Sequence, residues 1–280
     1  MRRPLGTCIR SRRLNRRRGR RAWSETLRNF LAALIGLAAC GLALPPPGSR
    51  AHAPARQALW LAVRACVADF KLIGAAFPCL RVDLKGGEER GYVVLRDPPD
   101  TILTPTRRVV GIEDPWLQSR EAPNYFDDAW RARRLLKGPD GRPLTRDDFA
   151  LAVNSALTRS QDQFHIHLGC LAPAVERWLP VLAPELPVGA WTRVGVPIAG
   201  ASFSALRTGR AIGADVEPIR LAAEAMGGKI NLARTTMLVA EIGIGASKEA
   251  VILVSDSGRT SAETMLDPAC SGPSRASDSH

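Results

Sequence analysis

The chain divides by charge near residue 50, and this division most constrains what the remainder can fold into. Residues 1–50 contain twelve arginines and one acidic residue, Glu25, which gives them a net charge of +11. The whole chain of 280 residues carries +12, so residues 51–280 are nearly neutral. They show no basic stripe interleaved with aromatic residues, which nucleic-acid-binding domains typically carry. We therefore predict a folded part that binds no nucleic acid.

Residues 1–50 have the composition of a targeting segment. The basic start is followed by an uncharged apolar run, Phe30 to Leu44, which ends at Pro45-Pro46-Pro47-Gly48. A helix of this length rises about 22 Å, less than the roughly 30 Å of a bilayer core, which suits a signal peptide or a short anchor. Because the arginines precede the apolar run, the N-terminus should stay in the cytoplasm and the remainder should be exported.

Three fates of this leader remain open. Ala51-His52-Ala53 has the small residues of a signal-peptide cleavage site, although Pro54 obstructs cleavage there. Leu37-Ala38-Ala39-Cys40 fits a lipoprotein box, and a retained anchor is the third fate. Each of them places residues 55–270, the predicted folded domain, outside the cytoplasm. The polar, small-residue tail 271–280 is predicted to be disordered.

The cysteines agree with export. Four of them lie beyond the leader, and an even number in an exported chain predicts two disulfides with three possible connectivities. Cys66 and Cys79 are close enough in sequence to close a local loop, which would leave Cys170 to pair with Cys270. Zinc binding is disfavoured because no pair has Cys-x-x-Cys spacing.

The order of predicted elements indicates an α+β fold. Helical periodicity alternates with pairs of β-rich runs, a pattern that favours an antiparallel sheet with helices packed on it. The predicted helices are 55–67 and 124–136, with weaker ones at 172–182 and 215–226. The predicted strands are 91–96, 101–104, 149–154 and 163–168, with weaker ones at 236–241 and 250–254. Residues beyond about 171 therefore form a C-terminal α+β extension.

Two histidines are the candidate chemical groups. His165 and His167 alternate with apolar residues on a predicted strand, so both side chains should point to the same face. Paired imidazoles suit metal binding or nucleophilic phosphoryl chemistry. A metal would need more ligands at suitable spacing, so we predict no metal and no cofactor. On these two residues alone, a pair that merely hydrogen-bonds on a sheet surface remains an alternative.

The residues around this pair resemble the signature of the histidine-triad family. Asn154 is followed seven residues later by Gln161, and then by Phe164-His165-Ile166-His167. The resemblance implies that His167, in the middle position, attacks phosphorus and that His165 is the first histidine. Gly169 replaces the third histidine, so the triad is incomplete.

A more specific resemblance is to the CDP-diacylglycerol pyrophosphatase family. It covers residues 60–175 firmly and 200–270 loosely. The matching pieces are Cys66 to Pro78-Cys79, Gly91 to Asp97, Leu103 to Thr106, Gly111-Ile112-Glu113, Pro123 to Phe126, Ala129 to Arg133, Ala152 to Ser155, Arg159-Ser160-Gln161, Phe164 to His167 and Ser261-Ala262-Glu263. Gln163 stands where this family often has a histidine, and it can donate a hydrogen bond to phosphate but cannot carry a proton.

The resemblance implies a HIT-like α+β fold in a bacterial inner-membrane protein, with one N-terminal anchor and the catalytic domain in the periplasm. It also implies hydrolysis of the lipid CDP-diacylglycerol to CMP and phosphatidate through a phosphoramidate on His167. His165, Gln161 and Arg108 would neutralise phosphate oxygens, and Asn154 and Gln163 would complete the substrate-binding set. The alternatives are an exported hydrolase or transferase of soluble nucleotides, and a non-catalytic domain that binds a nucleotide or lipid head group.

Overall fold

The structure is a computed structural model that describes residues 55–97, 100–137, 148–194, 202–225 and 231–270. The predicted leader, residues 1–50, and the predicted tail, 271–280, lie outside the described residues. Among the helices of the described ranges, none is both long enough and apolar enough to cross a membrane.

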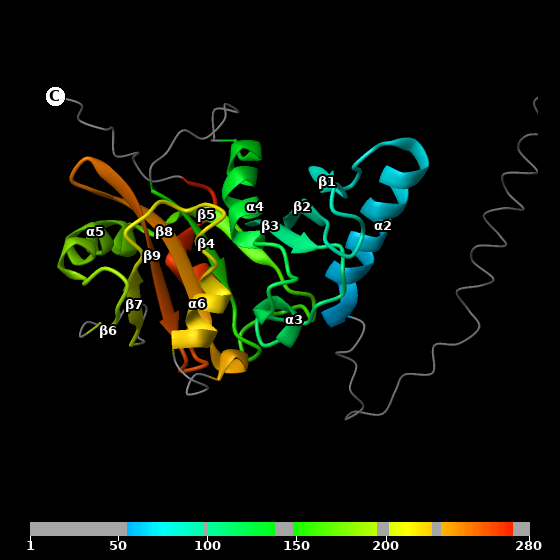
Figure 1. The fold of residues 1–280 in the computed structure, drawn as a ribbon. Helices are drawn as coiled ribbons and strands as arrows, with labels where there is room; N and C mark the ends of the chain where they lie inside the picture. Colours follow the sequence, from blue (N-terminus) through cyan, green and yellow to red (C-terminus); the bar gives the residue numbers. More distant parts are fainter. Residues whose placement is uncertain (1–54, 98–99, 138–147, 195–201, 226–230, 271–280) are drawn as a thin grey trace, which may run out of the picture. The chain divides into compact units, whose positions relative to one another are not determined.

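The core of the fold is one antiparallel sheet with strands of unequal length (Figure 1). Its order is β1-β2-β3-β5-β4-β8-β9-β7-β6, and β10 also pairs with β5. The strands are β1 (Arg81–Asp83), β2 (Tyr92–Asp97), β3 (Asp100–Pro105), β4 (Phe149–Val153), β5 (Ile166–Leu171), β6 (Trp191–Arg193), β7 (Ser204–Arg207), β8 (Thr236–Ile244), β9 (Ser247–Ser255) and β10 (Leu266–Asp267). Because β4 pairs with both β5 and β8, the C-terminal strands continue the same sheet.

The helices begin and end where local chemistry requires it. The Asn124 side chain accepts a hydrogen bond from the Asp127 amide and so caps α4, while Gly74 in the left-handed region ends α2. The α-helices are α2 (Ala58–Ile73), α3 (Pro115–Gln118), α4 (Tyr125–Ala132), α5 (Pro173–Leu182) and α6 (Pro218–Ala225). The short 3-10 helices are η1 (Ala55–Gln57), η2 (Arg133–Leu135), η3 (Ala183–Glu185), η4 (Leu232–Arg234) and η5 (Ala262–Met265).

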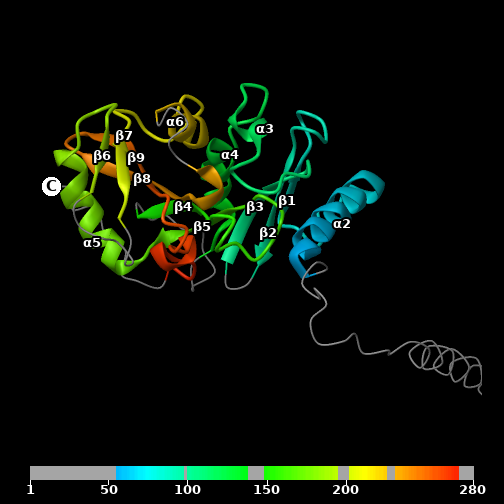
Figure 2. The same cartoon turned by 90° about the horizontal axis from the view of Figure 1, so that it is seen from below.

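The two faces of the sheet are covered differently. One face packs against α3, α4 and α6 around a large apolar cluster that includes Phe126, Leu151 and Ile166. The other face carries two separate clusters, one under α2 and one under α5 and η5. Figure 2 shows α2 and α5 at opposite ends of the sheet. The apolar side chains of Ile102 and Ala152 border a polar strip between these clusters, and both histidines lie in this strip.

The predicted α+β class is confirmed, with some corrections to the elements. The strand predicted at 163–168 begins only at Ile166. Residues 163–165 instead pack against the segment that follows β3, because the Phe164 amide donates to the Val109 carbonyl at 2.6 Å. The helix predicted at 124–136 ends at Ala132 and continues as η2. The short edge strand β1 was not predicted.

Both predicted disulfides are present. Cys66 joins Cys79 across 13 residues, and Cys170 joins Cys270 across 100 residues. Disulfides persist where the environment is oxidising, so they support export of the folded chain. The second one fixes the C-terminal segment beside β5, the strand that carries His167.

Candidate active site

His167 lies near the middle of the sheet. It is the second residue of β5 and pairs with Ile102 of β3 on one side and Ala152 of β4 on the other. Its ring lies 4.8 Å from the ring of His165, which confirms that the two histidines share one face. Both are buried, and strand pairing on both sides fixes the backbone position of His167.

Each ring nitrogen of His167 faces a different set of partners. Nδ1 lies 3.2 Å from the carboxylate of Asp100, at the start of β3. Nε2 lies 3.4 Å from the Asn154 side-chain nitrogen and 3.6 Å from a Glu263 carboxylate oxygen. Asp100 is largely buried, so its carboxylate favours the tautomer that carries the proton on Nδ1. The Nε2 lone pair then accepts from the Asn154 side-chain amide and lies on the side of Glu263, whose side chain is 45% exposed.

Asn154 connects the histidine strip to the C-terminal segment. Its side-chain nitrogen donates to Glu263 at 2.9 Å, and its oxygen accepts from the Ala262 amide at 2.7 Å. The hydroxyls of Thr158 and Ser261 also donate to this oxygen. Asn154 therefore holds η5 over the sheet and places the Glu263 carboxylate near Nε2 of His167.

His165 is fully enclosed and electrically neutral. Burial, together with the neighbouring His167, lowers the pKa of its imidazole from 6.5 to about 3. The backbone carbonyl of Gln163, 2.7 Å from Nδ1, requires the proton on that nitrogen. His165 thus presents a neutral ring to its neighbour.

The remaining predicted site residues make contacts within the protein. Gln161 accepts a hydrogen bond from the Leu59 amide at 3.0 Å and caps the start of α2. The Gln163 amide donates to the carbonyls of Pro105 and Arg107, at 3.1 and 3.0 Å. It therefore holds the segment after β3 against the histidines.

Arg108 is exposed, and its guanidinium lies over the Trp60 ring, 5.8 Å from the ring centroid. The structure brings Asn154, His165 and His167 together. It places Arg108 beside α2 instead, and a phosphate contact from this residue stays a prediction.

The C-terminal segment covers the position where a third histidine would stand. A side-chain carbon on Gly169 would lie 3.3 Å from the Asp267 carbonyl oxygen and from Cα of Pro268. These contacts are tighter than ordinary packing, so a large side chain would displace β10. Gly169 therefore suits close approach of this segment, which brings Glu263 to His167.

Among the described residues, Asp100, His167 and Glu263 form a group that could hold one metal ion. Their ligand atoms lie within 4.8 Å of one another. The two carboxylates, however, contact different nitrogens of the imidazole. The absence of a metal ion therefore stays a prediction.

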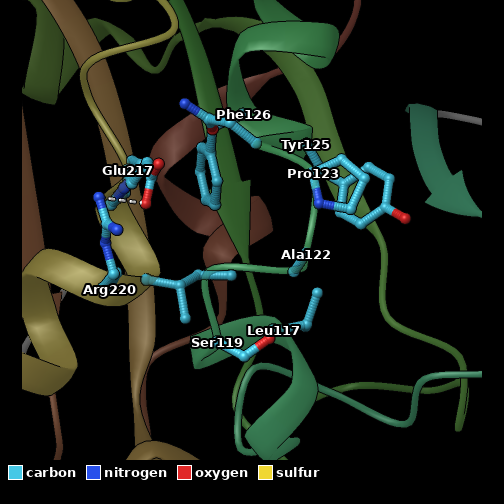
Figure 3. Close-up of a pocket in the computed structure, with 11 residues that line it drawn as sticks. Leu117, Ser119, Ala122, Pro123, Tyr125, Phe126, Glu217 and Arg220 are labelled. Carbon is cyan, nitrogen blue, oxygen red and sulfur yellow. Dashed lines mark ion pairs between the residues drawn. The ribbon is translucent and has the colours of Figure 1, made fainter. Parts of the chain in front are cut away.

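A pocket lies next to Asp100, and its lining includes neither histidine. It has a volume of about 210 Å³ and is lined by Arg96, Asp100, Lys137 and Pro268, among others. Another pocket, between α3, α4 and α6, is drawn in Figure 3. Its free space is only about 20 Å³, and Tyr125 and Phe126 in its wall belong to the cluster on the opposite face of the sheet. The second pocket is therefore separate from the histidines.

Two residues of the site were missed from the sequence. In the sequence, Asp100 belongs to a turn, and Glu263 belongs to one of the segments that resemble the family. Neither lies at a fixed spacing from His167, because β-pairing and the Asn154 contact bring them there. The one sequence signal for Asp100 was its position at the start of β3, the strand that pairs with the strand of His167.

The fold and the site define an α+β protein with a buried histidine whose two ring nitrogens each lie near a carboxylate. A family model described as CDP-diacylglycerol pyrophosphatase matches residues 54–273. The chain belongs to the CDP-diacylglycerol pyrophosphatase family, a family of hydrolases named for the pyrophosphate bond that they cleave.

Similar proteins carry the same name. A probable CDP-diacylglycerol pyrophosphatase of Mycobacterium leprae is 35% identical over 184 residues, which cover 64% of this chain and 66% of that protein. A CDP-diacylglycerol pyrophosphatase of Yersinia pestis is 30% identical over 223 residues, which cover 76% of this chain and 84% of that protein. The chain thus aligns with just under two thirds of the mycobacterial relative and with most of the Yersinia relative.

Proposed function

We propose that this chain hydrolyses CDP-diacylglycerol to CMP and phosphatidate, with His167 as the nucleophile. The observation that carries the proposal is the position of His167, whose Nδ1 lies 3.2 Å from the Asp100 carboxylate and whose Nε2 faces Asn154 and Glu263. A neutral imidazole with its proton on Nδ1 has its nucleophilic lone pair on Nε2. Family membership supplies the substrate class.

The reaction would take two steps. Nε2 attacks one phosphorus of the anhydride, an N–P bond forms, and the P–O bond to the leaving phosphate breaks. The Nδ1 proton stays shared with Asp100, which stabilises the positive charge that develops on the ring. A water oxygen then attacks the phosphoramidate, its proton passes to Glu263, and the N–P bond breaks to restore the lone pair. Arg96 and Lys137, in the pocket beside Asp100, would attract the phosphates.

We further propose that the chain is held at the bacterial inner membrane by its N-terminal leader, with the enzyme domain in the periplasm. The two disulfides support an oxidising compartment. The arginine-rich leader with its apolar run supports the membrane attachment and the orientation.

The deciding experiment is hydrolysis of CDP-diacylglycerol in detergent by the full chain, beside a His167→Ala variant. We expect the wild type to release CMP and the variant to lose essentially all activity, because no other described histidine has a carboxylate at Nδ1. Glu263→Gln should slow the second step, so that an acid-labile phosphorylated or nucleotidylated enzyme accumulates.

Some outcomes would contradict the proposal. A folded His167→Ala protein that keeps most of its activity would remove His167 as nucleophile. A folded, oxidised wild type that binds CMP without turnover would favour a binding domain. Preference for water-soluble dinucleotides in competition would replace the lipid substrate with a soluble one.

A further inference from the structure

Large apolar side chains are concentrated at the end of α2 and in the loop that follows it. Leu72, Ile73 and Phe77 expose 80%, 75% and 74% of their surfaces, and Leu80 exposes 38%. We call these four residues the apolar tip. The loop joins α2 to β1 at the right of Figure 1, and the Cys66–Cys79 disulfide ties it back to α2. Clustered apolar exposure of this kind marks an interaction surface.

A basic pocket lies next to the apolar tip. Its volume is about 470 Å³, and it is lined from β1, the loop after β1, α4 and η2. We call this cavity the basic pocket because five basic residues line it: Arg81, Lys85, Arg90, Arg131 and Arg134. Arg81 directly follows Leu80 of the apolar tip. Asp83 and Asp128 are the acidic residues in the same wall, so the charge of the lining is clearly positive.

Only part of this charge is compensated within the protein. Arg81 pairs with Asp83 at 3.0 Å, and Arg131 pairs with Asp127 at 2.6 Å. Lys85 and Arg134 form no ion pair within the described part of the chain. The pocket therefore offers several cations to an external anion, and the elements that line it hold these cations close together.

The basic pocket borders a smaller pocket beside Asp100. It shares Leu135 in its wall with the smaller pocket that contains Asp100, the partner of His167. Arg96 and Lys137 in that smaller pocket extend the positive surface. A surface bound at the basic pocket would thus lie close to the pocket beside Asp100.

We propose that the apolar tip and the basic pocket form one surface that docks onto an anionic lipid bilayer. The tip enters the acyl boundary, and the pocket receives phosphate head groups at the membrane surface. The inference rests on the proposed function in one respect, namely that the substrate is a membrane lipid. A second copy of the chain is a poorer occupant, because a symmetric contact at the tip would bring two basic pockets toward each other.

The test uses tryptophan fluorescence of the full chain on vesicles whose lipids carry brominated acyl chains. Phe77→Trp places a reporter in the apolar tip, and the wild-type spectrum is subtracted to remove the native tryptophans. Val181→Trp is the matched control, since Val181 on α5 is 73% exposed and α5 lies at the other end of the sheet. On brominated phosphatidylglycerol vesicles, we expect the tip reporter to lose most of its emission and the α5 reporter to retain its emission.

Charge removal tests the other half of the surface. Lys85→Gln with Arg134→Gln, in the Phe77→Trp background, should weaken docking of the tip on phosphatidylglycerol by about thirty-fold. The same change should have little effect on phosphatidylcholine vesicles. An equal effect on both lipids would show that the pocket does not meet the anionic surface and would overturn the proposal.

Two further outcomes would also overturn it. Equal quenching of the tip reporter and the α5 reporter would mean that no particular surface faces the lipid. A tip reporter that is shielded from both brominated lipid and aqueous acrylamide would be in contact with protein instead. None of these readings depends on turnover, so failure of the docking proposal and failure of the proposed hydrolysis remain distinguishable.

Discussion

His165 is a titratable side chain that the fold keeps neutral, and this has a consequence for stability in acid. Its folded pKa of about 3 lies below the ordinary value of 6.5. Between these values the unfolded chain binds a proton that the folded chain does not bind. The free energy of unfolding should therefore fall as pH drops from 6.5, by up to about 1.4 kcal/mol per pH unit from this residue.

The measurement is urea unfolding of the wild type and of His165→Gln from pH 7 to pH 4. The half-buried Asp128 carboxyl, whose pKa desolvation raises to about 6, contributes in the opposite direction below that pH. Both proteins contain Asp128, so the difference between their curves isolates His165. We expect the wild type to lose more stability on acidification than the variant. Parallel curves would show that His165 is not held neutral.

For individual residues, the sequence predicted relations between side chains that lie close together along the chain. The alternation around His165 and His167 predicted that they share a face, and their rings lie together. Asp100 and Glu263 were not predicted as site residues, because they reach His167 through strand pairing and through Asn154. Such contacts depend on which strands become neighbours, and no short sequence pattern records that order.

Among the elements, η5 and β10 are small but position the exposed carboxylate of the site. Gly169→Ala should push on Asp267 and Pro268, destabilise the chain by about 1–3 kcal/mol and reduce turnover, because Glu263 belongs to the same segment. Gly243→Ala is the control, since Gly243 lies on β8 with nothing within 4 Å of an added carbon. Thermal unfolding and CDP-diacylglycerol hydrolysis would check both. Equal effects of the two substitutions would contradict this account of Gly169.

Element prediction succeeded for periodic segments and failed at their ends. The β2–β3 hairpin and strands β4, β8 and β9 lie within a few residues of their predicted positions. The start of β5 was wrong because Gln163 and Phe164 bond to the segment after β3 rather than to a neighbouring strand. Residues beyond 171, predicted as a C-terminal extension within the same domain, continue the main sheet because β8 pairs with β4.

For the whole molecule, the two disulfides should have different effects on turnover. Replacing Cys170 and Cys270 by serine opens a loop of 100 residues, which the chain-entropy model values at about 4.7 kcal/mol. It should also lower turnover, because that bridge holds the segment that carries Glu263. Replacing Cys66 and Cys79 should cost about 3 kcal/mol and spare hydrolysis of detergent-dispersed substrate. Urea unfolding and CMP release would compare the pairs, and an equal loss of turnover would count against this role of the second bridge.

The distance along the chain between Asn154 and Glu263 has a consequence for when the enzyme becomes active. Glu263 follows Asn154 by 109 residues, and ribosomes add about 5–20 residues per second. The histidines therefore exist for several seconds before their exposed carboxylate has been made. The bridge between Cys170 and Cys270 forms later still, once both thiols have reached an oxidising compartment. Under the proposed mechanism a nascent chain would be inert beside the ribosome, and arrival in an oxidising compartment would set the moment at which hydrolysis can begin.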